Sequence, residues 1–135
     1  MRMADKDAKA FDTDLRDCTL LGEGNNGWVY LMPDGRVIKI CREAKSCIKE
    51  YYILKRAQRS KNFPKVYEQC GNYMIRDFVG GTCASKYIKR RGLSRTLAVN
   101  IANLIEEFER LNFTKLDIRC RDLFVQDDGS IIVID

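Results

Sequence analysis

Three aspartates near the end of the chain have the type and spacing of residues that handle phosphate chemistry. Asp117 and Asp122 lie five residues apart in a polar stretch, and Asp135 follows the apolar run 131–134 at the last position of the sequence. Carboxylates can accept a proton from an attacking hydroxyl, and they can hold a divalent cation beside phosphate oxygens. The three residues therefore predict a site that handles a proton, a metal ion and phosphate together.

A glycine-rich segment near the N-terminus is a second candidate for phosphate binding. Residues 22–29 read Gly-Glu-Gly-Asn-Asn-Gly-Trp-Val, a G-x-G-x-x-G-x-V pattern. Dinucleotide-binding folds share G-x-G-x-x-G, but there the third glycine opens a helix, whereas here the β-rich run 28–31 and a turn follow Gly27. We therefore expect a glycine loop between two antiparallel strands, whose backbone amides can close over phosphates.

Lys39 and Glu50 form a third candidate pair. Lys39 lies in the strand-like run Val-Ile-Lys-Ile, where alternation places it on the same face as Val37. It is either a solvent-facing strand residue or a cation held over phosphates. Glu50 lies on the flank of the buried stripe of a helix expected at 44–59, where it could meet Lys39. Because an unpaired charge there would be costly, we predict a Lys39–Glu50 ion pair.

These residues must be positioned by short strands and a few helices. Apolar runs bounded by turn residues predict strands at 19–21, 28–31, 37–40, 65–68, 73–79, 123–125 and 131–134. Ser94 is expected to cap a long helix that reaches about residue 113. Its buried stripe is expected to comprise Leu97, Ile101, Leu104, Phe108 and Leu111. Strands and helices are segregated rather than alternating, so the fold class is α+β.

Composition limits the classes of protein that need to be considered. The chain has 135 residues, 45% of them hydrophobic, which is typical of a single globular domain. Its net charge of +5 is compatible with anionic partners such as nucleotides. No apolar run is long enough for a membrane span, and the polar start lacks the apolar stretch of a signal peptide, so we expect a cytoplasmic protein.

Cysteine and histidine usage excludes further classes. The six cysteines never form Cys-x-x-Cys and there is no histidine, which argues against a zinc site and excludes Ser-His and Cys-His catalysis. Without a signal peptide, we expect the cysteines to be reduced and to serve as small core or surface residues.

Taken together, the order of these motifs resembles that of a eukaryotic-type serine/threonine protein kinase. The glycine loop, the strand lysine Lys39, the helix glutamate Glu50 and the loop 117–122 occur in the kinase order over residues 18–135. The resemblance implies an N-terminal arm at 1–17 and an N-lobe at 18–79, with a five-stranded antiparallel sheet and one helix. It also implies a hinge and minimal C-lobe at 80–135, with a long helix, a catalytic loop and a β-hairpin.

The resemblance also implies a role for each candidate residue. Lys39 would hold the ATP phosphates while paired with Glu50, and Asp117 would accept the proton of the substrate hydroxyl. Arg119 would steady the γ-phosphate, and Asp122 and Asp135 would hold Mg²⁺. The remaining nucleotide contacts would come from the glycine loop and from the hinge beside the adenine. These residues are Gly22, Glu23, Gly24, Asn25, Asn26, Gly27, Val29, Asp77 and Val79.

The sequence departs from the kinase pattern in three places. Lys115 and Leu116 replace the histidine and arginine that usually precede the catalytic aspartate, and Asp122 replaces a metal-binding asparagine. A carboxylate remains a good Mg²⁺ ligand. No activation segment follows Asp135, so we expect a small or truncated kinase-like domain.

Three functions are compatible with these residues. The first is an ATP- and Mg²⁺-dependent phosphotransferase that acts on a hydroxyl, with protein serine or threonine as the acceptor. The second is a catalytically weak or inactive pseudokinase that binds nucleotide or a regulatory protein partner. The third, a nucleic-acid-binding protein, is disfavoured because the basic residues are dispersed except at 86–95. A kinase-like core without its usual lower helices should expose apolar surface, which predicts self-association, for example as a homodimer.

Overall fold

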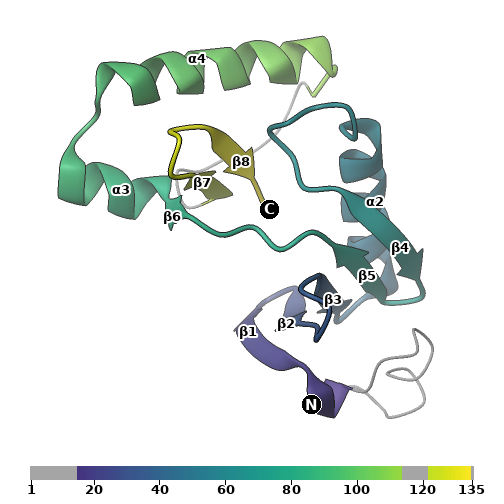
Figure 1. The fold of residues 1–135 in the computed structure, drawn as a ribbon. Coiled ribbons are helices and arrows are strands. Elements are labelled where there is room, and N and C mark those ends of the chain that lie inside the picture. The colour runs from purple at the N-terminus through teal and green to yellow at the C-terminus, as the bar shows by residue number, and fades with distance from the viewer. Residues whose placement is uncertain (1–14, 114–121, 135) are drawn as a thin grey trace. The chain divides into compact units, whose positions relative to one another are not determined.

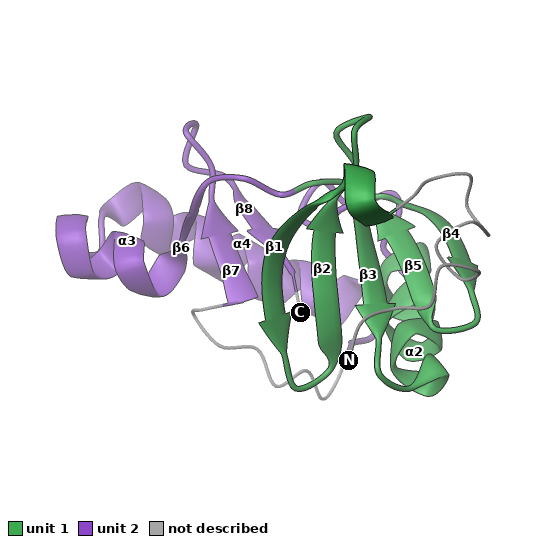
Figure 2. Ribbon diagram, turned by 90° about the horizontal axis from the view of Figure 1, so that it is seen from below, with its two compact units in different colours: residues 1–55, 65–78 green, residues 56–64, 79–135 purple. Residues whose placement is uncertain are grey.

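The computed structural model describes residues 15–113 and 122–134, which form two compact units (Figures 1 and 2). Unit 1 comprises residues 1–55 and 65–78, and unit 2 comprises residues 56–64 and 79–135. The elements are η2 (Leu15–Asp17), β1 (Thr19–Gly24), β2 (Gly27–Leu31), β3 (Val37–Cys41), α2 (Ala44–Arg56), β4 (Val66–Cys70), β5 (Tyr73–Arg76), β6 (Thr82–Cys83), α3 (Ala84–Arg91), α4 (Arg95–Arg110), β7 (Leu123–Val125) and β8 (Ile131–Val133). The expected α+β class is confirmed. The domain boundaries expected at residues 17 and 79 stay predictions.

Unit 1 is built on a five-stranded antiparallel sheet in the order β1-β2-β3-β5-β4 (Figure 2). The expected turn between β2 and β3 closes with the Met32 amide donating to the Arg36 carbonyl at 2.8 Å. Gly35 takes a φ of 90° in this turn, which glycine adopts without strain. Turn chemistry and the alternating strand pattern together explain why the sheet could be predicted.

The two faces of this sheet bury different chemistry. One face carries an apolar cluster, whose buried members are Met32, Ile38, Ile40, Tyr73 and Ile75. The opposite face carries the alternate residues of the same strands, among them Lys39. Helix α2 lies against this second face, since Glu50 pairs with Lys39. The predicted face of Lys39 is thus confirmed.

Helix α2 has the predicted stripe, with Cys47 and Leu54 buried and Tyr51 half-buried, but it ends at Arg56 rather than near residue 59. A disulfide joins Cys47 to Cys41 at the end of β3, with a Cα–Cα distance of 5.8 Å. The expectation that all cysteines are reduced is therefore wrong for this pair. It failed because the two residues meet only when the helix packs on the strand. Cys70 and Cys83 are free thiols.

Unit 2 contains the three-stranded sheet β6-β7-β8, helix α3 and helix α4 (Figure 1). Ser94 caps α4 as predicted, because its hydroxyl accepts a hydrogen bond from the Leu97 amide at 3.1 Å. Of the predicted stripe, Leu97 and Leu104 are fully buried. Half-buried positions complete it, namely Ile101, Phe108 and Leu111.

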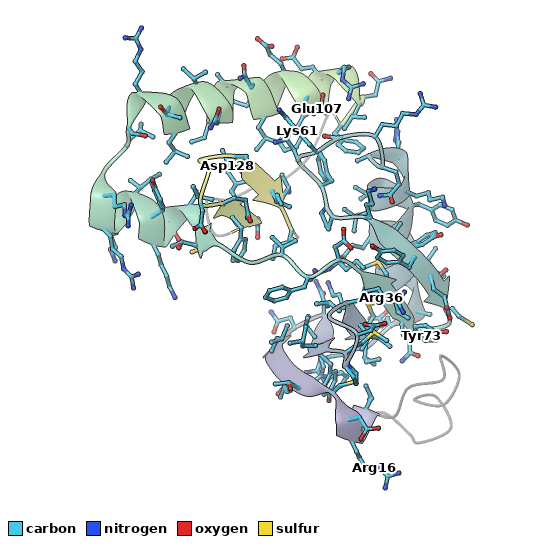
Figure 3. The ribbon with its side chains drawn as sticks, viewed as in Figure 1. Arg16, Arg36, Lys61, Tyr73, Glu107 and Asp128 are labelled. Atoms are coloured by element: carbon cyan, nitrogen blue, oxygen red, sulfur yellow. A yellow bond between two sulfur atoms is a disulfide. The ribbon has the colours of Figure 1, made fainter. Side chains whose placement is uncertain are left out.

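The segment 56–64 fastens the sheet and helix α4 of unit 2. The Asn62 side-chain amide donates to the Ile131 carbonyl at 2.8 Å, and the Asn62 backbone carbonyl accepts from the Val133 amide, also at 2.8 Å. Ser60 hydrogen-bonds to Glu107 on α4, and Lys61 adds an attractive charge beside that carboxylate (Figure 3).

Helix α3 was not expected from the sequence. Its eight residues carry four cations and bury only Ala84, so they present no apolar stripe of helical period. Within the described ranges, no helix is both long and apolar enough to cross a membrane.

Candidate functional site

The candidate site contains a nearly buried ion pair on the face of the unit 1 sheet that α2 covers. The Lys39 Nζ lies 2.5 Å from Glu50 Oε1, and the two side chains are only 9% and 11% exposed. The predicted pair is confirmed, and the alternative of a solvent-facing Lys39 is wrong. Taking two charges out of water is costly unless they are paired, so this arrangement fixes the position of the ammonium group.

The sheet register places three of the predicted residues in one row. Gly22 on β1 is opposite Val29 on β2, Val29 is opposite Lys39 on β3, and Lys39 is opposite Met74 on β5. Directly opposed residues of an antiparallel sheet share a face. Gly22, Val29 and Lys39 therefore lie on the same face, although up to seventeen positions separate them in the chain.

The three glycines of the loop 22–27 differ in whether packing requires them. Gly27 is buried with a φ of 146°, and a Cβ there would lie 1.9 Å from the Ile40 carbonyl oxygen, so packing in the sheet requires glycine. A Cβ at Gly22 or Gly24 would meet nothing within 4 Å. Packing within the described residues thus gives no reason for glycine at these two positions. Between Gly22 and Gly27, the residues Glu23, Gly24, Asn25 and Asn26 are exposed.

Arg42, just after β3, holds this loop, and the sequence analysis missed it. Its guanidinium lies 3.2 Å from both the Glu23 carboxylate and the Gly24 carbonyl, and 4.3 Å from the centre of the Trp28 ring. Its amide donates to the Asn26 carbonyl at 2.9 Å. The opposite charges of Glu23 and Arg42 were visible in the sequence, but only the pairing of β2 with β3 brings them together.

Arg76 is the second residue that the sequence analysis missed. It ends β5 on the same face as Lys39, is 7% exposed, and donates from Nη1 to the Asp77 carbonyl at 2.9 Å. Its buried Nε has no hydrogen-bond partner among the described residues. Burial lowers the pKa of Arg76, while the charges of Glu50 and Asp77 oppose that shift. Glu50 is therefore the ion-pair partner of Lys39 and, together with Asp77, a source of negative charge near Arg76.

The predicted hinge residues Asp77 and Val79 lie just beyond β5. The Asp77 carboxylate accepts a hydrogen bond from the Tyr67 hydroxyl at 2.5 Å and another from the Lys65 amide at 3.2 Å. The first of these raises the pKa of Tyr67. The Asp77 side chain thus ties β4 to β5, and Val79 is half-buried. Their expected contacts with adenine stay predictions.

Of the four loop residues predicted for catalysis and metal binding, Asp117, Arg119 and Asp135 lie outside the described residues. Asp122 is half-buried directly before β7, and its carbonyl accepts from the Ile134 amide at 2.9 Å. Residues 15–113 and 122–134 contain no cluster of three His, Cys, Asp or Glu side chains suited to a metal ion. Since Asp135 is outside these ranges, the predicted Mg²⁺ ligands are untested.

Comparison with known proteins agrees with the fold. No model of a known protein family matches the sequence. The putative serine/threonine-protein kinase YrzF of Bacillus subtilis (strain 168) is 20% identical over 125 residues, which is 88% of this chain and 58% of the relative. The structure of the Cydia pomonella granulovirus kinase PK-1 superposes with a TM-score of 0.69 at 18% identity, over 98% of this chain and 55% of that one.

These likenesses define the class of the molecule. The chain has a protein-kinase-like fold, and the prediction of a protein-kinase-like domain is confirmed. It spans a little over half the length of the two kinases that it resembles.

Proposed function

We propose that this chain binds ATP with Mg²⁺ and takes part in transfer of the γ-phosphate to a hydroxyl group of a protein serine or threonine. The observation that carries the proposal is the nearly buried Lys39–Glu50 pair in the row of Gly22 and Val29. A phosphate site needs a fixed cation beside backbone that a ligand can approach closely, and this face offers both.

The cost of the pair supports a functional reading. Apolar residues of similar size are often as stabilising as a buried ion pair, so stability alone is a weak reason to bury Lys39 and Glu50. Gly22 and Gly24 leave open space that packing in the described residues does not require. A lysine held in place beside such a strand suits the phosphates of a nucleotide.

Each predicted residue has a part in this proposal. The amides of residues 22–27 close over the phosphates, Lys39 contacts them, and the backbone near Asp77 and Val79 borders the adenine. Asp117 accepts the proton of the acceptor hydroxyl as its oxygen bonds to the γ-phosphorus and ADP leaves, while Arg119 balances charge on the transferred group. Asp122 and Asp135 hold the Mg²⁺, which neutralises phosphate charge when bound. We place this activity in the cytoplasm and expect self-association.

Nucleotide binding is tested first, by calorimetric titration with ATP in the presence and absence of Mg²⁺. We expect Mg²⁺-dependent binding that Lys39→Ala abolishes. Because Lys39→Ala also disturbs a buried pair, Gly22→Val is the second variant. It should keep the unfolding midpoint of the wild type yet weaken ATP binding, since its side chain occupies the space left open for phosphate. The exposed Lys45→Ala is the control and should bind normally. ATP binding unchanged in Gly22→Val would contradict the proposed site.

Phosphate transfer is tested separately, with γ-labelled ATP and a generic serine/threonine protein acceptor. Label should reach the acceptor or the chain itself, and Asp117→Ala should abolish the transfer while ATP binding persists. Mg²⁺-dependent binding without any transfer would instead favour the catalytically inactive nucleotide-binding module. Transfer that persists in Asp117→Ala would exclude the proposed role of that residue.

A further inference from the structure

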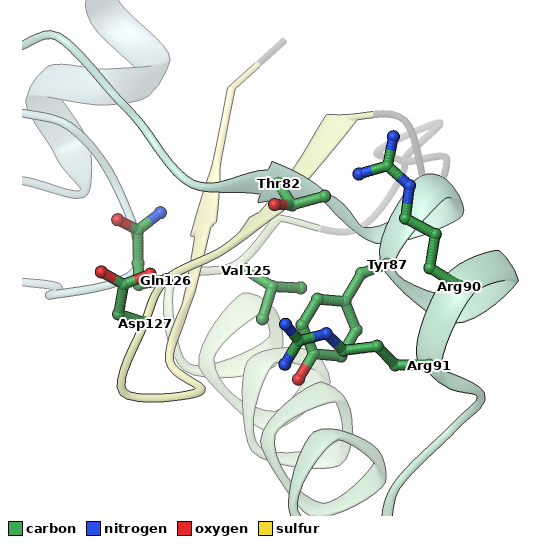
Figure 4. A pocket seen from close by; sticks show the side chains of 7 residues that line it. All are labelled: Thr82, Tyr87, Arg90, Arg91, Val125, Gln126 and Asp127. Carbon is green, nitrogen blue, oxygen red and sulfur yellow. The ribbon is translucent and has the colours of Figure 1, made fainter.

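A polar cavity lies wholly within unit 2, between helix α3 and the end of β7 (Figure 4). Its volume is about 190 Å³. Drug-sized ligands usually occupy roughly 300 to 1,000 Å³, so this cavity suits a single side chain or a small group. Its lining residues are Thr82, Tyr87, Arg90, Arg91, Val125, Gln126 and Asp127.

The lining combines cationic donors with hydroxyl groups and one apolar side chain. Arg90 and Arg91 each offer a fork of N–H donors, and the Arg91 guanidinium carbon lies 5.6 Å from the centre of the Tyr87 ring. Figure 4 shows the Tyr87 ring beside Val125, with Thr82 on the neighbouring strand. Hydrogen bonds from the Gln126 amide to the Gly80 and Phe124 carbonyls fix the opposite side.

Among the described residues, neither arginine of the cavity has the carboxylate partner that some other exposed arginines have. Arg36, Arg42 and Arg110 each form an ion pair with a nearby acid. In the part of the chain that the structure describes, Arg90 and Arg91 form none. Basic residues in the last turn of α3 also interact favourably with the helix dipole. That interaction would be satisfied by any cation, and it does not explain why two guanidinium groups lie at a cavity that also contains hydroxyl groups.

We propose that this cavity binds the phosphate group of a phosphorylated peptide side chain. A phosphate dianion matches the charge of two arginines, and its oxygens can accept more hydrogen bonds than a carboxylate offers. Tyr87 and Val125 provide an apolar wall for the carbon atoms that carry the phosphate. Lys86 and Lys89 are exposed on the same helix, where acidic residues beside the phosphorylated position can contact them.

Asp127 gives the site a distinctive electrostatic feature. Its carboxylate also lines the cavity and repels a bound dianion. Removing this charge while keeping the shape of the side chain, as in Asp127→Asn, should therefore strengthen phosphate binding. A positively charged surface that acted without a specific cavity would respond equally to the loss of any exposed carboxylate, whether or not that carboxylate lines the cavity.

The test is fluorescence anisotropy with a short labelled peptide that contains one phosphoserine, compared with the same peptide carrying serine. We expect only the phosphorylated form to bind. The variant Arg90→Gln/Arg91→Gln should weaken binding by about tenfold or more, as expected for loss of charge-assisted hydrogen bonds. The control Lys45→Gln/Lys49→Gln removes the same charge from exposed positions of α2 and should change affinity by less than about threefold, since these lysines do not line the cavity and salt screens exposed charges.

Each outcome decides for or against the cavity. Equal weakening by the two double variants would overturn the proposal in favour of nonspecific charge attraction, as would weaker binding to Asp127→Asn. Equal or tighter binding of a labelled single-stranded RNA that competes with the peptide would replace it with a nucleic-acid surface. Circular dichroism melts of each variant verify folding. If the arginine variant unfolds, Asp127→Asn is compared with Glu109→Gln, which removes the same charge from an exposed position outside the cavity. Tighter binding of Asp127→Asn alone supports the cavity, and equal tightening overturns it.

Discussion

The two units of this molecule hold their charged residues in different ways. In unit 1, Lys39, Glu50 and Arg76 are almost completely buried on one sheet face, next to a disulfide that joins the strand to the helix. In unit 2, the charged side chains that fasten the elements lie near the surface, as Glu107 and Arg110 do, and the cations of α3 are exposed.

The difference follows from the environment of each charge. Removing one member of a buried set leaves an uncompensated charge in a medium that cannot solvate it, whereas water replaces a lost partner at the surface. We therefore expect substitutions in the candidate site to cost much more stability than substitutions of charged residues in unit 2.

Breaking the buried pair should have the largest effect. Glu50→Leu leaves Lys39 buried without its ion-pair partner and removes the larger of the two carboxylate charges that act on Arg76. It should therefore lower the free energy of unfolding by about 5 kcal/mol. Lys39→Met leaves Glu50 with the charge of Arg76 still nearby, so the loss should be nearer about 3 kcal/mol. Urea unfolding measures both. Lys45→Met, which removes an exposed lysine, is the control and should change stability by less than about 0.5 kcal/mol. A larger loss of stability for Lys39→Met than for Glu50→Leu would mean that the charge of Glu50 does not stabilise Arg76.

Reducing the disulfide should have the next largest effect. Cys41 and Cys47 are six positions apart, and closing so short a loop stabilises the fold by about 2 kcal/mol through the entropy of the unfolded chain. The urea midpoint of the wild type should fall when a reductant is added. The variant Cys41→Ala/Cys47→Ala should not respond to reductant, whereas the control Cys70→Ser should respond as the wild type does. A wild-type midpoint independent of reductant would show that the bond does not stabilise unit 1.

Removing the helix cap in unit 2 should have a smaller effect. Ser94→Ala deletes the hydroxyl that accepts the Leu97 amide, and loss of such a cap costs about 1 kcal/mol. Thermal unfolding followed by circular dichroism measures the change. Ser46→Ala, in the first turn of α2, is the control and should not lower the midpoint, because alanine has a higher helix propensity than serine. Equal effects of the two changes would argue against a stabilising role for the cap.

The smallest effect should come from Glu107 and should depend on pH. Hydrogen bonds from Arg110 and then Ser60 lower the pKa of Glu107 from its ordinary value of 4.5 to about 2. Its contribution is therefore present above about pH 4.5 and is lost as the pH falls from there toward 2. Glu107→Gln should flatten this part of the stability curve, measured by urea midpoints at a series of pH values. Glu106→Gln, which alters the neighbouring carboxylate, should leave it steep. Identical acid profiles for wild type and Glu107→Gln would contradict the assignment.

The sequence predicted those parts of the candidate site that depend on local period and on the cost of burying charge. Strand alternation placed Lys39 on the correct face, and helical period placed Glu50 on the flank of the buried stripe. The same local rules identified the Ser94 cap and the turn glycines. In each case the interaction lies within one helix or turn, or it joins two elements whose buried faces could be predicted from hydrophobic periodicity.

Residues whose roles depend on the pairing of separate strands were missed. Arg76 lies within the strand predicted at 73–79, but only the β3–β5 register shows that it shares the face of Lys39. Arg42 reaches Glu23 only through the pairing of β1, β2 and β3. Helix α3 was not predicted because its charged residues leave no apolar stripe of helical period, although Ala84 is buried at its start, directly after β6.

Local patterns in the amino-acid sequence were sufficient for the α+β class, most of the elements though not their ends, the glycine loop and the lysine–glutamate pair. They were sufficient because propensity, turn chemistry and hydrophobic period act over short distances along the chain. Three further contacts became visible only in the folded molecule: Cys41 meets Cys47, the charge of Glu50 acts on Arg76, and two arginines line a cavity with Tyr87. These contacts depend on strand register and on the packing of helices against sheets. Neither leaves a periodic signal in the amino-acid sequence.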